Sequence, residues 1–402
     1  MLVSLVLALY ALTSLPTLDD VPTLAKAALE GDRIAVTRLR ALGPPGLDAL
    51  VKLRRELSSV PPLFFGPPSR EVLAWEQLVD EVARQRHASA SGLYWYTDLA
   101  EAQAVARREG RPILSLRLLG DLDEDLSCAN SRFFRTILYP DPAIARALHD
   151  GWVLHWESVR RAPVIRIDFG DGRVLTRTIT GNSLHYALTP DGEVADVLPG
   201  MVGPEAFRAW LDAAAEVVAE VSPLTPDARR AAIFAHLERD LGQRLEAWQA
   251  ALAAIGVDRP RTLTALAAAM TDETLDRLAA RERIRLSDEA AALVGPMMTT
   301  GDGRLALLAM PLAVTKAAVE RPMLRLLAPV TAQLAKDQVR NTLEMKSRVL
   351  AIALEEHADL HALTSAIYAR AFLTPLDDPW MGLAPPDVFT GLPPSVEKSA
   401  SR

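Results

Sequence analysis

The residue best suited to chemistry in this chain is its single cysteine, Cys128, which lies directly before a segment with helical spacing. Unpaired backbone N–H groups and the helix dipole favour negative charge at a helix N-terminus, so a cysteine there gains thiolate character. Such a thiol could form a mixed disulfide with a partner or be oxidised to a sulfenate. Because the chain has one cysteine, an intrachain disulfide and a zinc site built on several cysteines are both excluded.

Two other side chains are candidates for supporting this thiol. Ser131 follows Cys128 by three residues and could donate a hydrogen bond to the thiolate without attacking a disulfide. His185 lies two residues beyond Ser183 on a predicted strand, so the two side chains share a face and His185 could approach and activate Cys128. The alternatives are a strand histidine bonded to a neighbour and a cysteine buried as a small hydrophobic residue. The acidic run 121–125 would oppose a thiolate if it lay close.

Two polar patterns in the second half of the chain have a functional and a structural interpretation. His357 and His361 share a helix face and could hold a metal with a third ligand, or lie on a solvated face. A second group could form a buried polar network, line a groove or lie partly exposed; it comprises Asp337, Arg340, Asn341 and Glu344. The chain has no phosphate-binding glycine motif and no hydrolase Gly-x-Ser-x-Gly turn. We therefore predict no cofactor and no metal.

The elements that must position Cys128 begin at Leu93, where helical and strand patterns alternate. A helix is expected from Leu99 to Glu109, ending at Gly110, and another directly after Cys128. Strands are expected at 113–118, 152–156, 164–169, 174–179, 184–188 and 194–197, with a closing helix from Pro204. The turns Asp171-Gly172 and Pro190-Asp191-Gly192 are typical of hairpins. This alternation predicts an α/β layered domain over 91–220.

Helical patterns flank this region on both sides. Residues 18–90 predict a helical N-terminal region, and residues 221–375 a bundle of roughly five to seven helices. The proline-rich tail 376–402 is expected to pack back through Trp380. Residues 1–17 open with an uncharged apolar run that fits a secretory signal peptide or a buried first helix. The first interpretation predicts an exported protein, periplasmic or secreted, and the second a cytoplasmic one.

A specific set of residues in the centre of the chain matches a known pattern. The first part comprises Trp95, Asp98, Ala102 and Gly110-Arg111-Pro112. The second comprises Cys128-Ala129-Asn130-Ser131, Tyr139, Asp141-Pro142-Ala143-Ile144, Leu148 and Trp152-Val153. In these residues the segment resembles the thioredoxin-like domains of bacterial proteins. The resemblance implies an α/β thioredoxin-like central domain flanked by all-α N- and C-terminal regions.

The resemblance also marks three departures from the usual redox site. Ser131 stands where the second cysteine of a Cys-x-x-Cys motif is expected, which leaves a Cys-x-x-Ser variant. Ser127 replaces the aromatic residue before the first cysteine, and Ser183 occupies the slot of the proline that faces the active site. Two functions remain open. One is monothiol thiol–disulfide chemistry through Cys128; the other is a non-catalytic thioredoxin-fold module that binds a protein partner.

The net charge and the hydropathy of the chain indicate which classes of partner to expect. The formal net charge is -7 and there is no basic stripe, which argues against nucleic acid as a partner. No segment after the N-terminal run is apolar enough to cross a bilayer, since charged residues interrupt even the stretch 305–334. We therefore expect a protein partner and no transmembrane span.

Overall fold

The computed structural model describes residues 20–57, 70–178, 181–258, 260–287, 330–356, 359–379 and 381–382. The expectations about the apolar run 1–17, His357, Trp380 and most of the tail lie outside these residues. Within the described part of the chain, no helix combines the length and the apolar character needed to cross a membrane. This agrees with the expectation of no transmembrane span.

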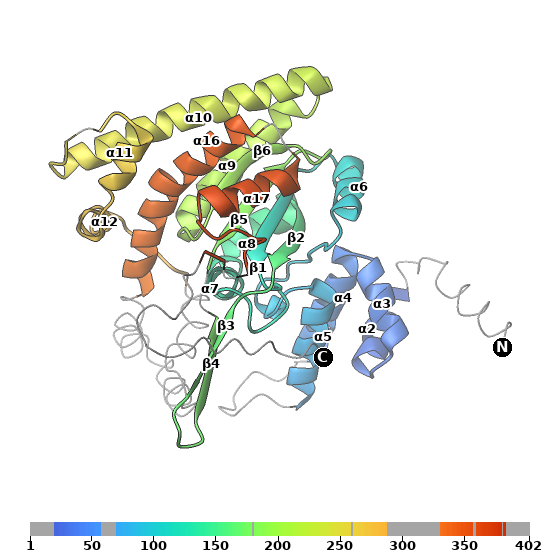
Figure 1. Ribbon diagram of the computed structural model, residues 1–402. Helices are drawn as coiled ribbons and strands as arrows, with labels where there is room; N and C mark the ends of the chain where they lie inside the picture. Colours follow the sequence, from blue (N-terminus) through green and yellow to red (C-terminus); the bar gives the residue numbers. More distant parts are fainter. Residues whose placement is uncertain are drawn as a thin grey trace.

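A four-stranded sheet lies at the centre of the molecule (Figure 1). Its strands are β1 (Ile113–Leu119), β2 (Val153–Arg160), β5 (Ser183–Leu188) and β6 (Val194–Pro199), in the order β2-β1-β5-β6. β1 is parallel to β2 and antiparallel to β5, and β5 is antiparallel to β6. Every residue of β1 is buried, because helices cover both faces of the sheet. The predicted strands are confirmed to within a few residues at their ends.

The helices of the central region begin where the sequence places their caps. Asp98 accepts hydrogen bonds from two N–H groups at the start of α6 (Leu99–Glu109), and Asp141 does the same for α8 (Pro142–Gly151). Cys128 caps the short α7 (Ala129–Phe133), which continues as the π-helical turn η3 (Phe134–Leu138). After β6 the chain enters α9 (Pro204–Val221), longer than the predicted closing helix.

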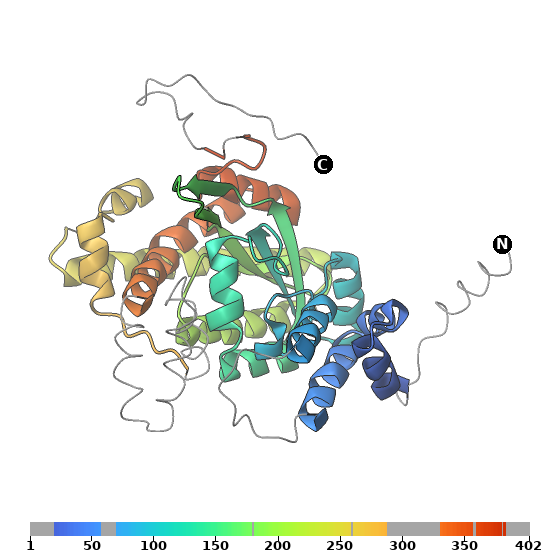
Figure 2. The same ribbon diagram turned by 90° about the horizontal axis from the view of Figure 1, so that it is seen from below.

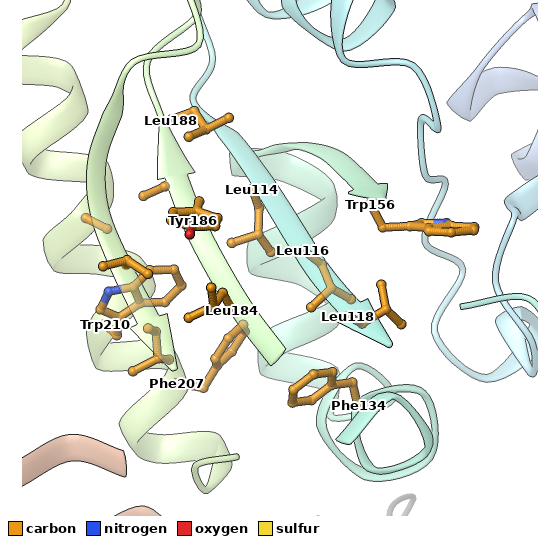
Figure 3. Packing of buried hydrophobic residues seen from close by; sticks show 14 of the residues in the cluster. Leu114, Leu116, Leu118, Phe134, Trp156, Leu184, Tyr186, Leu188, Phe207 and Trp210 are labelled. Atoms are coloured by element: carbon orange, nitrogen blue, oxygen red, sulfur yellow. The ribbon is translucent and has the colours of Figure 1, made fainter. Parts of the chain in front are cut away.

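One face of the sheet packs on aromatic side chains from the central helices. The ring centroid of His185 in β5 lies 4.6 Å from that of Phe134 in η3 and 5.0 Å from that of Phe207 in α9. Figure 3 shows Phe134, Phe207 and Trp210 in the buried cluster that also contains Leu114, Leu116 and Leu118, which lie on the same face of the sheet as His185. Burial of these large side chains is the main favourable contribution to folding of this region.

The N-terminal region packs around its own hydrophobic cluster. Its helices are α2 (Val21–Leu29), α3 (Arg33–Ala41), α4 (Pro44–Leu57) and α5 (Arg70–Ala83), followed by the single turn η2 (Ala88–Ala90). Arg40 joins this cluster to the central region, since its guanidinium donates to the carbonyls of Val82 and Trp95 at 2.9 and 2.5 Å. The same group lies 4.2 Å from the centre of the Tyr94 ring.

Part of a group of C-terminal helices packs directly on the sheet (Figures 1 and 2). Helices α10 (Pro226–Ala254), α16 (Lys346–Glu355) and α17 (Leu360–Arg370) contribute to the sheet cluster, and η5 (Arg340–Met345) precedes α16. Helices α11 (Leu263–Ala268) and α12 (Asp272–Ala279) pack instead against the end of α10 in a separate cluster. Val349 and Leu350 of α16 and Ile367 of α17 belong to the same buried cluster as β1. On the sheet face away from His185, Tyr186 and Thr364 of α17 are hydrogen-bonded at 3.1 Å. Helix α17 therefore covers that face.

A separate two-stranded ribbon interrupts the sheet between β2 and β5. It consists of β3 (Val164–Asp168) and β4 (Val174–Thr178), paired antiparallel. The ribbon extends away from the body of the molecule (Figure 1), and all five residues of β3 are exposed. The predicted turn Asp171-Gly172 lies at its tip, where Gly172 adopts a φ of 87°.

A buried lysine connects three parts of the fold. The ammonium of Lys346, which is fully buried, lies 3.1 Å from Asp196 of β6 and 3.1 Å from Asp240 of α10. Asp196 also accepts hydrogen bonds from the indole of Trp210 at 3.0 Å and from the N–H of Val197 at 2.6 Å. Burial raises the pKa of Asp240, but Lys346 and Arg244 outweigh this and lower it. The carboxylate therefore stays ionised against the lysine.

Replacing this lysine is expected to destabilise the whole protein. Lys346→Ala leaves Asp196 buried without its cation and removes one of the two cations beside Asp240, and we expect it to lower the free energy of unfolding by about 3–5 kcal/mol. Lys336→Ala is the matched control, because Lys336 is a partly exposed lysine of the preceding helical turns that pairs with Asp276. Its removal should cost about 1 kcal/mol or less. Urea unfolding measures both, and equal losses would contradict the role of Lys346.

Candidate functional site

Cys128 is held between the end of β1 and the start of α7. Its N–H donates to the carbonyl of Leu119 at 3.0 Å, and its Sγ accepts the N–H of Ser131 at 3.4 Å. The cysteine has no exposed surface. The expected place of the thiol before a helix is confirmed, but the sulfur does not reach the surface.

Burial controls the protonation of this thiol. It raises the pKa of Cys128, and the hydrogen bonds from backbone N–H groups and the charge of Arg132 only partly offset it. Two acidic side chains of the run 121–125 pair with arginines, Asp123 with Arg84 and Asp125 with Arg86. Cys128 is therefore a neutral thiol at physiological pH, not an activated thiolate.

Ser131 contacts the sulfur through its backbone and not through its hydroxyl. The Ser131 hydroxyl hydrogen-bonds the hydroxyl of Ser127, which also accepts from the guanidinium of Arg135 at 3.1 Å. Ser127 in turn donates to the carbonyl of Glu124 at 3.1 Å. The two serines thus hold the loop before α7 in place. The expectation that the Ser131 side chain would bond the thiolate is not met.

His185 is paired with an aromatic hydroxyl. Its Nε2 lies 2.8 Å from the hydroxyl of Tyr139, and its buried Nδ1 has no hydrogen-bond partner within the described residues. Burial lowers the pKa of His185 to about 3, so the ring is neutral. Neither ring nitrogen bonds the Cys128 sulfur, and the expected activation of the thiol by His185 finds no contact to support it. The alternative, a strand histidine bonded to a neighbour, describes the geometry.

Ser183 lies at the start of β5 and connects the strand to α7. Its hydroxyl accepts a hydrogen bond from the side-chain amide of Asn130 at 2.8 Å. Just before it, the carbonyl of Asn182 accepts the hydroxyl of Tyr368 of α17 at 3.0 Å. Burial raises the pKa of Tyr368. Tyr368 and Cys128 belong to the same buried cluster, so α17 and the thiol are parts of one hydrophobic core.

A cleft of about 420 Å³ opens at the edge of the sheet where α7 begins. The chain segments before β5 and after β6 form one side, through Asn182 and Met201. The π-helical turn η5 forms the other. All four polar residues that the sequence grouped together line this cleft, namely Asp337, Arg340, Asn341 and Glu344. The groove interpretation of that group is therefore confirmed, and π-turns of this kind occur often at functional sites.

Two glycines allow asparagine side chains to approach the cleft closely. Gly200 has a φ of 68°, and a Cβ there would lie 2.4 Å from the amide nitrogen of Asn341. A Cβ on Gly181 would lie 2.7 Å from the amide oxygen of Asn130. Asn341 donates to the carbonyl of Met201 at 2.8 Å, which links η5 to the end of β6. Larger residues at either glycine would move these amides out of position.

The cleft carries charges of both signs. Glu344 pairs with Arg348 at 2.8 Å one helical turn later. Arg340 is nearly half exposed, and its nearest carboxylate, that of Asp272, lies 4.0 Å away. Burial raises the pKa of Asp337, which the amide of Gln333 and the charge of Arg340 counteract in part. Apolar groups complete the lining, through Met201, Met270, Met345, Phe372 and Leu373.

The sequence patterns did not single out Arg117, a buried arginine on the face of the sheet away from His185. Arg117 of β1 is 4 % exposed, pairs with Glu157 at 2.9 Å and donates to the hydroxyl of Ser115 at 3.0 Å. That hydroxyl lies 2.9 Å from Nδ1 of His155. The signal was a single charged residue within an otherwise apolar strand pattern. Burial lowers the pKa of both Arg117 and His155, that of His155 to about 3.

The described residues do not gather the ligands of a metal site. No group of three or more His, Cys, Asp or Glu side chains with suitable geometry occurs in the part of the chain that the structure describes. His361 is exposed on α17, and His357 lies outside the described residues. The metal interpretation of the histidine pair therefore gains no support from the fold.

The buried thiol should resist alkylation in the folded protein. We expect iodoacetamide to modify native Cys128 at least about 100-fold more slowly than the guanidinium-unfolded chain, because the sulfur must be uncovered first. Cys128→Ser serves as the blank, and mass spectrometry counts the adduct. A fast native reaction that titrates below pH 8.5 would show an accessible thiolate and contradict the buried geometry.

The two buried histidines should make the protein less stable in mild acid. His155 and His185 bind a proton in the unfolded chain near pH 6.5, but in the folded protein only near pH 3. Between these values the unfolded state holds more protons, so stability falls as the pH is lowered. Urea unfolding at pH 7 and pH 5 should differ by about 2 kcal/mol for each histidine.

A pair of substitutions isolates the contribution of His185. In the variant His185→Phe with Tyr139→Phe, the stability lost between pH 7 and pH 5 should shrink by about 2 kcal/mol. His149→Gln is the control, since His149 is about half exposed. An unchanged pH dependence in the double variant would show that His185 is protonated in the folded protein.

Comparison with known proteins adds no family to this geometry. No protein-family model matches the chain, and no similar protein is found among curated proteins or among solved structures. Inference about function therefore rests on the two features described above, the covered thiol of Cys128 and the polar cleft at the start of α7.

Proposed function

We propose that this chain is a thioredoxin-like module that binds a polypeptide partner in the cleft beside α7 and does not use its cysteine for redox chemistry. The observation that carries the proposal is the complete burial of Cys128 as a neutral thiol beside an open polar cleft. A thiol–disulfide exchanger needs an accessible thiolate, whereas a binding module needs only the cleft.

The connection of the strands supports the thioredoxin-like part of the proposal. β1 and β2 form a parallel strand–helix–strand unit, and an antiparallel hairpin of β5 and β6 joins its sheet beside β1. The closing helix α9 follows β6. This is the order of helices and strands that the resemblance implies, with the ribbon of β3 and β4 inserted before the hairpin.

The lining of the cleft suits an extended peptide. Asn182 and Asn341 carry both donors and acceptors, which can pair with the N–H and C=O groups of a peptide backbone. Methionine side chains are flexible and polarisable, so Met201, Met270 and Met345 can adapt to different apolar side chains. A volume of about 420 Å³ is within the range of small binding sites.

Monothiol chemistry is the other candidate function. It would require the fold to open around Cys128, which has no exposed surface and belongs to the hydrophobic cluster that also contains Tyr368 of α17. It would also require a base, and the neutral ring of His185 is bonded to Tyr139. The geometry of the folded chain favours binding over this chemistry.

A selection experiment tests the proposal. A library of random ten-residue peptides is selected on the immobilised full chain under reducing conditions, and the recovered peptides are measured by fluorescence anisotropy. We expect Cys128→Ala to change the dissociation constant by less than about threefold, and Arg340→Glu or Gly200→Val to raise it at least tenfold. Arg208→Glu is the control, because Arg208 is an exposed arginine of α9 outside this cleft.

Two results would contradict the proposed function. One is peptides whose affinity is unchanged by both cleft variants, which would place binding elsewhere on the chain. The other is capture that disappears in Cys128→Ala or requires oxidising conditions, because a mixed disulfide would then hold the peptide. Near-UV circular dichroism of each variant confirms that the fold is retained.

A further inference from the structure

The ribbon of β3 and β4 exposes apolar side chains that no described residue covers. Five of the eleven exposed large apolar side chains in the described part of the chain lie on it: Val164, Ile165, Ile167, Phe169 and Val174. Phe169, beside the tip, is 56 % exposed. A two-stranded ribbon is marginally stable alone in water and gains stability from a third strand. Exposed apolar residues on a projecting element therefore indicate a partner.

The register separates the side chains of the ribbon into two different faces. Ile165 is opposite Arg177 and Ile167 is opposite Leu175, while the N–H of Phe169 bonds the carbonyl of Arg173 at 3.1 Å. Side chains that are directly opposite share a face, so these six residues form one surface, which we call the basic-apolar face. The other face is mixed, since it carries Arg166 opposite Thr176 and Asp168 opposite Val174.

The charge on the basic-apolar face has one sign. Arg177 forms no ion pair within the described residues, and its guanidinium bonds only the carbonyl of Thr176 at 2.8 Å. Arg173 lies 5.6 Å from the centre of the Phe169 ring and pairs with Asp171 at the tip. No carboxylate of β3 or β4 lies on this face. In a chain with a net charge of -7, this face is thus positive and apolar.

From this pattern we propose that β4 accepts an additional strand from a protein partner in which apolar and acidic residues alternate. The outer edge of β4 carries no partner strand in the sheets of the described chain. A strand added there places alternate side chains on the basic-apolar face. In a strictly alternating strand all carboxylates then lie on this face, beside Arg173 and Arg177, and the apolar residues lie on the other face, beside Val174.

A second copy of this chain is a poorer occupant of the same edge. Antiparallel pairing of two β4 strands about Leu175 would bring Arg173 of one copy opposite Arg177 of the other, at both ends of the pair. Like charges directly opposite destabilise a strand pair. The charge of this edge therefore favours an acidic partner strand over self-association.

The ribbon is also connected to the thiol region. The hydroxyl of Thr178, at the end of β4, donates to the carbonyl of Ser127 at 3.1 Å and accepts from Arg132 of α7 at 2.9 Å. A strand added along β4 would therefore end close to α7. Binding on the ribbon and binding in the cleft nevertheless use different residues, so their variants separate the two proposals.

Two labelled peptides test the inference on the full chain. One is a nine-residue peptide of alternating valine and glutamate, and the other replaces each glutamate by lysine. We expect the acidic peptide to bind the wild type with an affinity at least tenfold higher than the basic one, by fluorescence anisotropy. Arg177→Glu should lower the affinity for the acidic peptide at least tenfold and raise that for the basic peptide. Arg166→Glu, on the other face of the same ribbon, should change either affinity less than threefold.

Specific outcomes would overturn the proposal. These are no binding of the acidic peptide up to 1 mM, equal binding of both peptides, or equal effects of Arg177→Glu and Arg166→Glu. Binding of the wild type to vesicles of phosphatidylglycerol, lost in Arg177→Glu, without binding of the acidic peptide would assign the face to a membrane instead. Arg340→Glu should leave the affinity for the acidic peptide unchanged, which distinguishes this site from the cleft.

Discussion

The charge of Lys346 has to be neutralised inside the protein, and this requirement fixes how the C-terminal helices meet the sheet. Its ammonium lies between Asp196 on β6 and Asp240 on α10, and it has no exposed surface with which to reach water. A buried cation left unpaired would cost several kcal/mol, so α16, β6 and α10 keep one relative position. Lys346 directly follows η5, and the same constraint therefore holds one wall of the cleft against the end of β6.

The covered state of Cys128 depends on this arrangement. Because α16 is fixed to β6, α17 is brought over the sheet face where Tyr186 bonds Thr364 and where Tyr368 bonds the carbonyl of Asn182. The residues after α17 then complete the cleft through Phe372 and Leu373. The C-terminal helices thus contribute to the hydrophobic cluster in which Cys128 is buried, and they build a polar cleft beside α7. A buried thiol beside a polar cleft favours binding over thiol exchange.

Local sequence patterns were sufficient to predict the helices and strands around Cys128. Contacts between residues distant in sequence determine the geometry of the site. The strands, the Asp98 and Asp141 caps and the place of Cys128 before α7 follow from patterns within about ten residues. Cys128 is buried in a cluster that includes residues of α16 and α17, and His185 is bonded to Tyr139, so both depend on residues far away in sequence that no local pattern reports. The polar spacing of Asp337 to Glu344 left a buried network, a groove and a partly exposed face as alternatives, and the segments that form the other side of the cleft became known only from the fold.

The three serines around α7, Ser127, Ser131 and Ser183, are all buried. Ser131 and Ser127 bond each other and Arg135, and Ser183 bonds Asn130, so each polar group at these positions has a partner within the protein. This agrees with the rule that buried polar groups are hydrogen-bonded. Ser127 and Ser131 tie α7 to the loop before it, and Ser183 ties α7 to β5 through Asn130, which lines the cleft. Ser183 therefore helps to fix the position of a residue of the cleft.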